Sequence, residues 1–284
     1  MSDRLSVRKT YKLYVGGAFP RSESGRSYTV NDAKGGFLAN ASRASRKDVR
    51  DAVVAARKAQ SGWAARTPYN RGQILYRVAE MLEGRREQFT EELRSTGLSK
   101  TAARAEVDAA VDRWVWYAGW ADKIAQVTGT ANPVSGPFFN FSTPEPSGVI
   151  GIVAPDGPLL GLVSVLAPVI AVGNTAVLVA AEPSPLPAIT LGEVLATSDL
   201  PGGVVNILTG HRAELAPWLA SHMDVNGLDL TGVSGDLATE CERAAAENLK
   251  RVLRPAQYAW TDDPGTIRMT TFLETKTVWH PVGV

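Results

Sequence analysis

Cysteine is nearly absent from this chain, since Cys241 is the only one among 284 residues. One cysteine cannot form a disulfide within the chain, and this composition predicts a reducing environment such as the cytoplasm. Long apolar runs are missing as well. The longest, Leu159 to Val172, contains Pro168 and falls short of the roughly 18 residues that span a bilayer. It therefore predicts a buried helix, and we expect no membrane partner.

Charge of one sign is not in excess either. The 30 basic and 29 acidic residues leave a net charge of +1 at pH 7, which argues against a nucleic-acid partner. Residues 1–12 are polar and basic and lack the apolar core of a secretory signal. The histidines His211, His222 and His280 lack the spacing of metal ligands, so no metal site is predicted.

The centre of the chain is strongly apolar and carries a regular pattern. Residues 149–153 form a β-branched run bounded by glycine and proline, which predicts a buried strand. Leucine and isoleucine then recur at helical spacing until Gly173, and a second apolar run follows at 176–179. A strand, a helix and a strand within so short a span predict a right-handed βαβ unit of a parallel sheet.

The remaining elements extend this pattern on both sides. A ribbon is predicted over 11–19, with its turn at Gly16 and Gly17. Amphipathic patterns then predict a helical N-terminal layer, with helices at 45–65 (capped by Ser45), 69–83, 86–94 and 102–125. In the second half, strands at 204–208, 227–230 and 251–253 alternate with helices at 185–197, 213–221 and 236–251. This alternation predicts an α/β fold with a doubly wound parallel sheet.

Two segments fall outside the alternating pattern. Residues 128–146 are rich in proline, glycine, serine and asparagine and hold Phe138, Phe139 and Phe141, which predicts an exposed hairpin. Apolar side chains on such a hairpin are a liability for a monomer, so we infer a partner surface there. The tail, 270–284, alternates polar and apolar residues and predicts a strand.

The central phrases resemble the cofactor-binding core of the aldehyde dehydrogenase superfamily. That family reads Gly-Val-Ile-Gly-x-Ile-x-Pro-Trp-Asn-x-Pro and, after a helix, Ala-x-Gly-Asn-x-Val-Val-Leu-Lys-Pro-x-Glu; the corresponding stretches here are 148–158 and 171–182. The likeness covers nearly the whole chain and is specific across 147–210. It implies a cofactor-type α/β domain formed by 1–127 and 147–254. It also implies a small β oligomerisation subdomain formed by the hairpin 128–146 and the terminal strand 268–284.

One large segment of the family's sequence has no counterpart in this chain. The family is considerably longer, and its catalytic domain with the nucleophilic cysteine would lie between Arg254 and Thr270, where 255–267 is predicted to be a short linker. Pro255 stands at the family's general-base glutamate and cannot move a proton. Asp156 and Gly157 follow the proline where the family has Trp-Asn, so the oxyanion-hole side chain is gone. Cys241 lies well upstream of the nucleophile position and is predicted to be a structural helix residue. The chain therefore resembles a truncated member without a catalytic residue.

The family's cofactor contacts are partly retained. Glu182 matches the glutamate that holds the adenosine ribose, but the accompanying lysine is Val179. The family's Thr-Gly-Ser-Thr-x-x-Gly phosphate phrase is replaced by 231–237, which leaves Gly232 and Ser234 as candidate cofactor-binding residues. Asp236 near the start of a helix would repel a pyrophosphate. NAD or NADP is thus a possible cofactor whose binding is weakened or lost.

Three functions follow from these observations. The first is a non-catalytic subunit that forms a hetero-oligomer with a full-length NAD(P)-dependent aldehyde dehydrogenase, or a homo-oligomer. The second is an NAD(P)-binding module, motivated by Glu182 and the intact βαβ unit. The third is an independent oxidoreductase acting on aldehydes, which would need a nucleophile that the sequence does not supply.

Overall fold

The centre of the protein is a five-stranded parallel sheet. The computed structural model describes residues 8–283; residues 1–7, the start of the polar segment 1–12, lie outside it, as does residue 284. The strand order is β7-β6-β5-β8-β9. These strands are β5 (Val149–Val153), β6 (Thr175–Val179), β7 (Val205–Leu208), β8 (Gly227–Asp229) and β9 (Arg251–Leu253). The chain winds outward from β5 to β7 and then crosses back to β8, which confirms the predicted doubly wound α/β fold.

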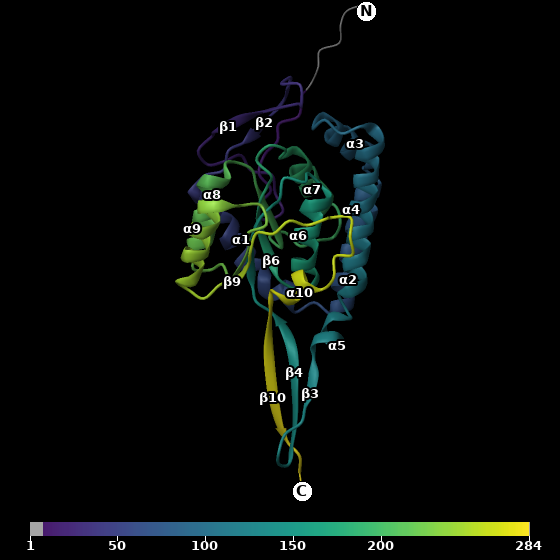
Figure 1. Cartoon of the computed structure of the whole chain (residues 1–284), viewed down its shortest axis with the longest axis vertical. Helices are drawn as coiled ribbons and strands as arrows, with labels where there is room; N and C mark the ends of the chain where they lie inside the picture. Colours follow the sequence, from purple (N-terminus) through teal and green to yellow (C-terminus); the bar gives the residue numbers. More distant parts are fainter. Residues whose placement is uncertain (1–7, 284) are drawn as a thin grey trace, which may run out of the picture.

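Helices cover both faces of this sheet (Figure 1). One apolar core holds α6 (Leu160–Ala171) and α7 (Leu186–Ala196), and the other holds α1 (Arg46–Ala64), α8 (Arg212–Ser221) and α9 (Gly235–Ala246). Every residue of α6 is buried, which explains why its sequence is apolar on all sides. In the described part of the chain, no helix is both long and apolar enough to cross a membrane.

The N-terminal helical layer lies outside α6 and α7. It consists of α2 (Pro68–Glu83), α3 (Arg86–Ser95), α4 (Lys100–Trp120) and α5 (Ile124–Thr128). Trp114 and Tyr117 are fully buried on the inner face of α4. The single helix predicted over 102–125 is wrong at its end, because a turn at 121–123 separates α4 from α5.

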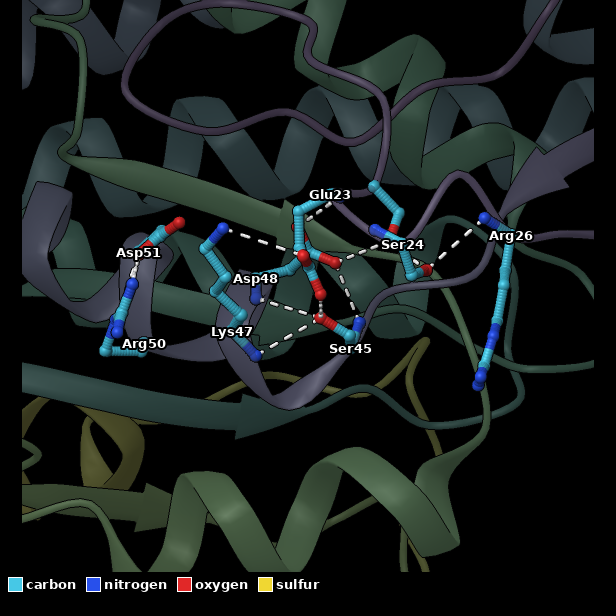
Figure 2. A network of polar contacts seen from close by, with 9 residues as sticks. Glu23, Ser24, Arg26, Ser45, Lys47, Asp48, Arg50 and Asp51 are labelled. Carbon is cyan, nitrogen blue, oxygen red and sulfur yellow. Dashed lines mark hydrogen bonds and ion pairs between the residues drawn. The ribbon is translucent and has the colours of Figure 1, made fainter.

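Helix α1 begins at the N-cap that the sequence predicted, Ser45, which forms a capping box with Asp48. The Ser45 hydroxyl accepts from the backbone N–H of Asp48 at 3.4 Å, and the Ser45 N–H donates to the Asp48 carboxylate at 2.8 Å. Figure 2 shows Glu23 and Lys47 beside this cap, and Glu23 also accepts from the Ser45 hydroxyl at 2.9 Å. The cap therefore fixes the loop around Glu23 to the start of the helix.

The first strands differ from the prediction. A hairpin forms from β1 (Ser27–Asn31) and β2 (Phe37–Ser42), which the sequence analysis missed. The ribbon predicted over 11–19 is shorter than predicted, because its arms pair antiparallel around the turn, at Val15 and Ala18, without forming strands. That segment makes only isolated bridges, among them Tyr14 to Ile207 beside β7. Its turn is present at Gly16 and Gly17, both with positive φ. The bridges from Tyr11 to Ala41 and from Tyr14 to Ile207 join this segment to partners remote in sequence, which local alternation does not reveal.

A three-stranded antiparallel sheet leaves the body as an arm and carries the C-terminus (Figure 1). Its strands are β3 (Thr130–Asn132), β4 (Phe138–Pro146) and β10 (Leu273–Pro281), in the order β10-β4-β3. The predicted hairpin and terminal strand thus join in one sheet. Before β10 lies the short helix α10 (Ile267–Thr270). The helix predicted over 236–251 is too long, since α9 ends at Ala246 and Leu249 has a φ of 56°.

Gly232 allows the turn after β8 to lie directly on β5. Its N–H donates to the Val153 carbonyl at 2.9 Å. A β-carbon at Gly232 would lie 2.7 Å from that oxygen and would overlap the carbonyl group of Ala154. These obstacles are backbone atoms, which cannot rotate away.

We expect Gly232→Ala to lower the free energy of unfolding by about 3 kcal/mol, because overpacking against backbone forces β5 and β8 apart. Gly119→Ala is the matched control, since a β-carbon there meets open space on helix α4. It should raise stability by about 0.5–1 kcal/mol through helix propensity. Urea unfolding measures both effects, and a Gly232→Ala protein as stable as the wild type would contradict the packing role.

Candidate functional site

The candidate site lies beyond the carboxyl ends of β5 and β8. Ligands of doubly wound sheets bind at this point, where the strand order reverses. The structure brings two of the three predicted residues to this edge, Glu182 after β6 and Gly232 after β8. Ser234 is exposed at the start of α9 and caps no backbone N–H. The close packing of Gly232 on β5 accounts for this glycine without any ligand.

Both carboxylate oxygens of Glu182 already have partners. One lies 2.7 Å from Nδ1 of His211, and the other accepts from the backbone N–H of Arg212 at 3.0 Å. Partial burial opposes ionisation, but these two hydrogen bonds outweigh it and hold the pKa of Glu182 below its usual value. The carboxylate is therefore ionised and held by the loop that follows β7. The sequence analysis did not identify these two partners, His211 and Arg212, as site residues.

Arg212 spans the carboxyl end of β5. Its guanidinium donates to the Ala154 carbonyl at 2.8 Å and pairs with the Asp156 carboxylate at 2.7 Å. Gly157 stands where the resemblance places the oxyanion-hole asparagine, and Asp156 stands where it places the tryptophan. Gly157 has no side chain, and a carboxylate paired as Asp156 is cannot donate a hydrogen bond, so neither residue supplies the side-chain donor of an oxyanion hole.

A polar cavity of about 460 Å³ opens beside these groups, between β1 and the loops after β5 and β7. Its polar lining includes Tyr28, Asn31, Asp156, Glu182, His211 and Arg212. The volume lies in the range of small-molecule sites. The Tyr28 hydroxyl and Nε of Arg212 are buried beside it without a hydrogen-bond partner. The residues on this side fit a hydroxyl-bearing group such as a ribose.

The start of helix α6 does not fit a phosphate. Glu106, which projects from α4, accepts from the backbone N–H groups of Leu159 and Leu160 at 3.1 and 3.2 Å. These are the groups that a helix N-terminus offers to an anion. A carboxylate in their place satisfies the helix and repels a pyrophosphate. The chain thus fits the ribose of a dinucleotide better than its phosphates.

The end of β8 is closed by the segment before β10. Asp229 forms a buried ion pair with Arg268 of α10, and both side chains are nearly inaccessible. The Arg268 guanidinium lies 4.3 Å from the ring centroid of Tyr258 and 5.3 Å from that of Trp260. Arg113 of α4 donates to the carbonyl of Trp260 at 2.6 Å. The predicted linker 255–267 therefore lies fastened over the sheet.

Cys241 does not belong to this site. Its side chain is fully buried on the inner face of α9. Burial, with a smaller contribution from Glu240, raises the pKa of the thiol to about 11. The thiol is therefore protonated at neutral pH and lacks the thiolate that nucleophilic catalysis needs, as expected for a structural helix residue. Among residues 8–283, no three His, Cys, Asp or Glu side chains gather as a metal site would require.

We expect His211→Ala to raise the pKa of Glu182 toward its usual value, because one of the two hydrogen bonds that stabilise the carboxylate is lost. A pKa lowered by folding adds stability above the unfolded-state pKa of about 4.3, and this stability disappears as the pH falls through the folded value. The wild type should thus exceed the variant in stability at neutral pH and lose that advantage in acid. Carbon-detected NMR titration of Glu182 measures the shift. His222→Ala, remote from Glu182, is the control, and an unchanged Glu182 pKa in His211→Ala would refute the assignment.

Comparison with known proteins agrees with this architecture. The model of the aldehyde dehydrogenase family matches residues 19–254. Cytosolic aldehyde dehydrogenase 1 of Elephantulus edwardii is 34% identical over 249 residues, which are 85% of this chain and 49% of that protein. The solved structure of HpcC from Thermus thermophilus superposes with a TM-score of 0.81 at 31% identity, covering 86% of this chain and 47% of that one.

A second solved structure bears on the cofactor. The NAD+ complex of an aldehyde dehydrogenase from Bacillus cereus has a TM-score of 0.81 and 29% identity, and it covers 86% of this chain and 50% of that one. The chain thus spans about half the length of the relatives it matches and has the fold of their NAD-binding domain. With the family model matched over most of its length, this chain belongs to the aldehyde dehydrogenase family.

Proposed function

We propose that this chain is a non-catalytic subunit that assembles with a full-length NAD(P)-dependent aldehyde dehydrogenase and stabilises or regulates it. The observation that carries the proposal is the arm formed by β3, β4 and β10, which projects from the body with apolar side chains exposed (Figure 1). The single, buried cysteine agrees with a place in the cytoplasm.

The arm has two features of a protein–protein interface, exposed aromatic side chains and a free strand edge. Phe138, Phe139 and Trp279 are 42%, 53% and 56% exposed. Phe138 and Trp279 pack edge to face at 5.7 Å, so the two strands present one aromatic patch. Strand β10 also leaves one edge without a neighbouring strand in the described structure. Exposed aromatic residues beside a free strand edge favour association through this arm.

The residues at the family's catalytic and cofactor-binding positions also support a non-catalytic role. Pro255 and Gly157 stand where the family has its general base and its oxyanion-hole asparagine, and the thiol of Cys241 lies elsewhere in the fold, buried and protonated. Glu106 and Arg212 occupy positions that a dinucleotide would approach. An independent aldehyde oxidoreductase would have to overcome each of these substitutions. We therefore also propose that NAD(P) binds weakly or not at all.

We expect the tagged chain, drawn from its own cell extract, to emerge in a complex with a complete aldehyde dehydrogenase, identified by native mass spectrometry. The triple change Phe138→Ser, Phe139→Ser and Trp279→Ser should abolish this assembly with little effect on the melting temperature, because these side chains are exposed. Tyr69→Ser with Tyr76→Ser, exposed aromatic residues on α2, is the matched control. A wild-type monomer would defeat the proposal, and a complex of this chain with itself alone would replace it by a homo-oligomer.

The second candidate is an NAD(P)-binding module, favoured by the ionised Glu182 beside the polar cavity. In that case NAD or NADP should raise the melting temperature. Ligand at 100 times its dissociation constant adds about 2.7 kcal/mol of stability. Glu182→Gln should remove the effect, while Glu193→Gln, outside the cavity, should retain it. Unchanged melting of the wild type at millimolar nucleotide would exclude this candidate.

A further inference from the structure

The segment 255–268 crosses the sheet beyond β8. From β9 it passes in front of α6 toward α4 and returns to α10 (Figure 1). Arg113 of α4 holds its backbone by donating to the carbonyls of Trp260 and Asp262, at 2.6 and 3.0 Å. Two contacts from one guanidinium fix the middle of the segment to the helical layer.

Arg268 fastens the other end. Its side chain is 4% exposed, pairs with Asp229 and donates to the Thr231 hydroxyl at 3.1 Å. Tyr258 and Trp260 stack on each other with ring centroids 5.0 Å apart and lie over the same guanidinium. The Arg268 guanidinium thus contacts the end of β8 through Asp229 and the faces of the two aromatic rings, an arrangement that cation–π interaction favours.

Trp260 packs against the loop after β5 and the start of α6. A β-carbon on Gly161, in the first turn of α6, would lie 3.3 Å from two atoms of the Trp260 ring, and one on Gly157 would lie 3.7 Å from its Nε1. The cavity left beneath the segment, which Ser164 also lines, has a volume of about 60 Å³. That space is too small for an aromatic ring with its sugar, since ligand sites occupy about 300–1,000 Å³.

A dinucleotide in this fold lies across the switch point, with the acidic residue after the second strand on its adenosine ribose. Glu182 marks that half, and the polar cavity beside it is open. The other half would extend past the ends of β5 and β8, where Trp260 and Arg268 lie. The two halves of the crevice therefore differ, because one is open and the other is occupied by Trp260 and Arg268. Trp260 also borders a second cavity of about 430 Å³, which lies on the α4 side against Ala102 and Glu106 and is lined by no residue of β5 or β8.

We propose that residues 255–268 form an autoinhibitory seal, locked by Arg268, that keeps the second half of a dinucleotide out of the crevice between β5 and β8. The inference deepens the proposed non-catalytic function and rests on it, because a sealed crevice has no room for the group that would accept a hydride. The seal admits at most the adenosine half of a dinucleotide.

Calorimetric titration with NAD and with adenosine monophosphate tests the seal. In the wild type, NAD should bind no more tightly than the monophosphate, within about twofold, because only the shared half has access. Tyr258→Ala with Trp260→Ala should raise the affinity for NAD by at least about tenfold and leave that for the monophosphate unchanged. Trp279→Ala, a tryptophan on the arm, is the matched control and should change neither affinity.

Three results would overturn the seal. They are a wild type that binds NAD at least about tenfold more tightly than the monophosphate, an opened variant with no gain for NAD, and absence of NAD binding in both proteins. Circular dichroism establishes that the variants fold, and the single change Trp260→Leu replaces the double variant if the latter does not. Co-assembly with a full-length enzyme should survive opening of the seal, since the arm is untouched. Failure of the seal is thereby distinguishable from failure of the proposed function.

Discussion

Pairing of β5 along both of its edges is the constraint on which the rest of the structure depends. It pairs with β6 on one side and β8 on the other, and each of its residues is buried. Its backbone is thereby satisfied except at the carboxyl end, where the next polar groups need partners from elsewhere. The Val153 carbonyl meets the N–H of Gly232, and the Ala154 carbonyl meets Arg212. The candidate site is formed by the groups that supply hydrogen-bond partners to the backbone at the carboxyl end of β5.

Charge pairing within the chain then determines what that site can do. Arg212 pairs with Asp156, Arg268 pairs with Asp229, and the Glu182 carboxylate is hydrogen-bonded to His211, each contact joining different elements. Of these, the Arg268–Asp229 pair is removed from water, where each charge needs the other, so breaking it would destabilise the closed arrangement. Groups engaged in this way are less available to the phosphates and hydroxyls of a cofactor. The same contacts that complete the strand end thus favour a structural role over catalysis.

The last two segments of the chain differ in how their aromatic side chains are placed: those of 255–268 pack onto the body, and Trp279 of the arm is exposed. In the seal, Tyr258 and Trp260 lie over the guanidinium of Arg268. Trp260 also packs against Gly161 and so covers the apolar start of α6. The arm leaves Trp279 beside Phe138 in solvent. The apolar surface covered by 255–268 is not available to a partner, whereas the exposed aromatic patch of the arm is. This contrast supports assembly through the arm.

Local chemistry in the sequence determined the helices of the N-terminal layer, the capping box at Ser45 and the alternation that makes the sheet parallel and doubly wound. The residue types at 157 and 255 also showed that the side chains which the family's motifs place there are replaced in this chain. Only the tertiary structure decided that Glu182 is held by His211 and Arg212 and that the predicted linker is a fastened segment. Arg268 and Asp229 are 39 residues apart in sequence, and Arg113 and Trp260 are 147 apart. Such pairs form because folding brings strand ends and helix faces together, and no local periodicity records which remote side chain fills the space between them.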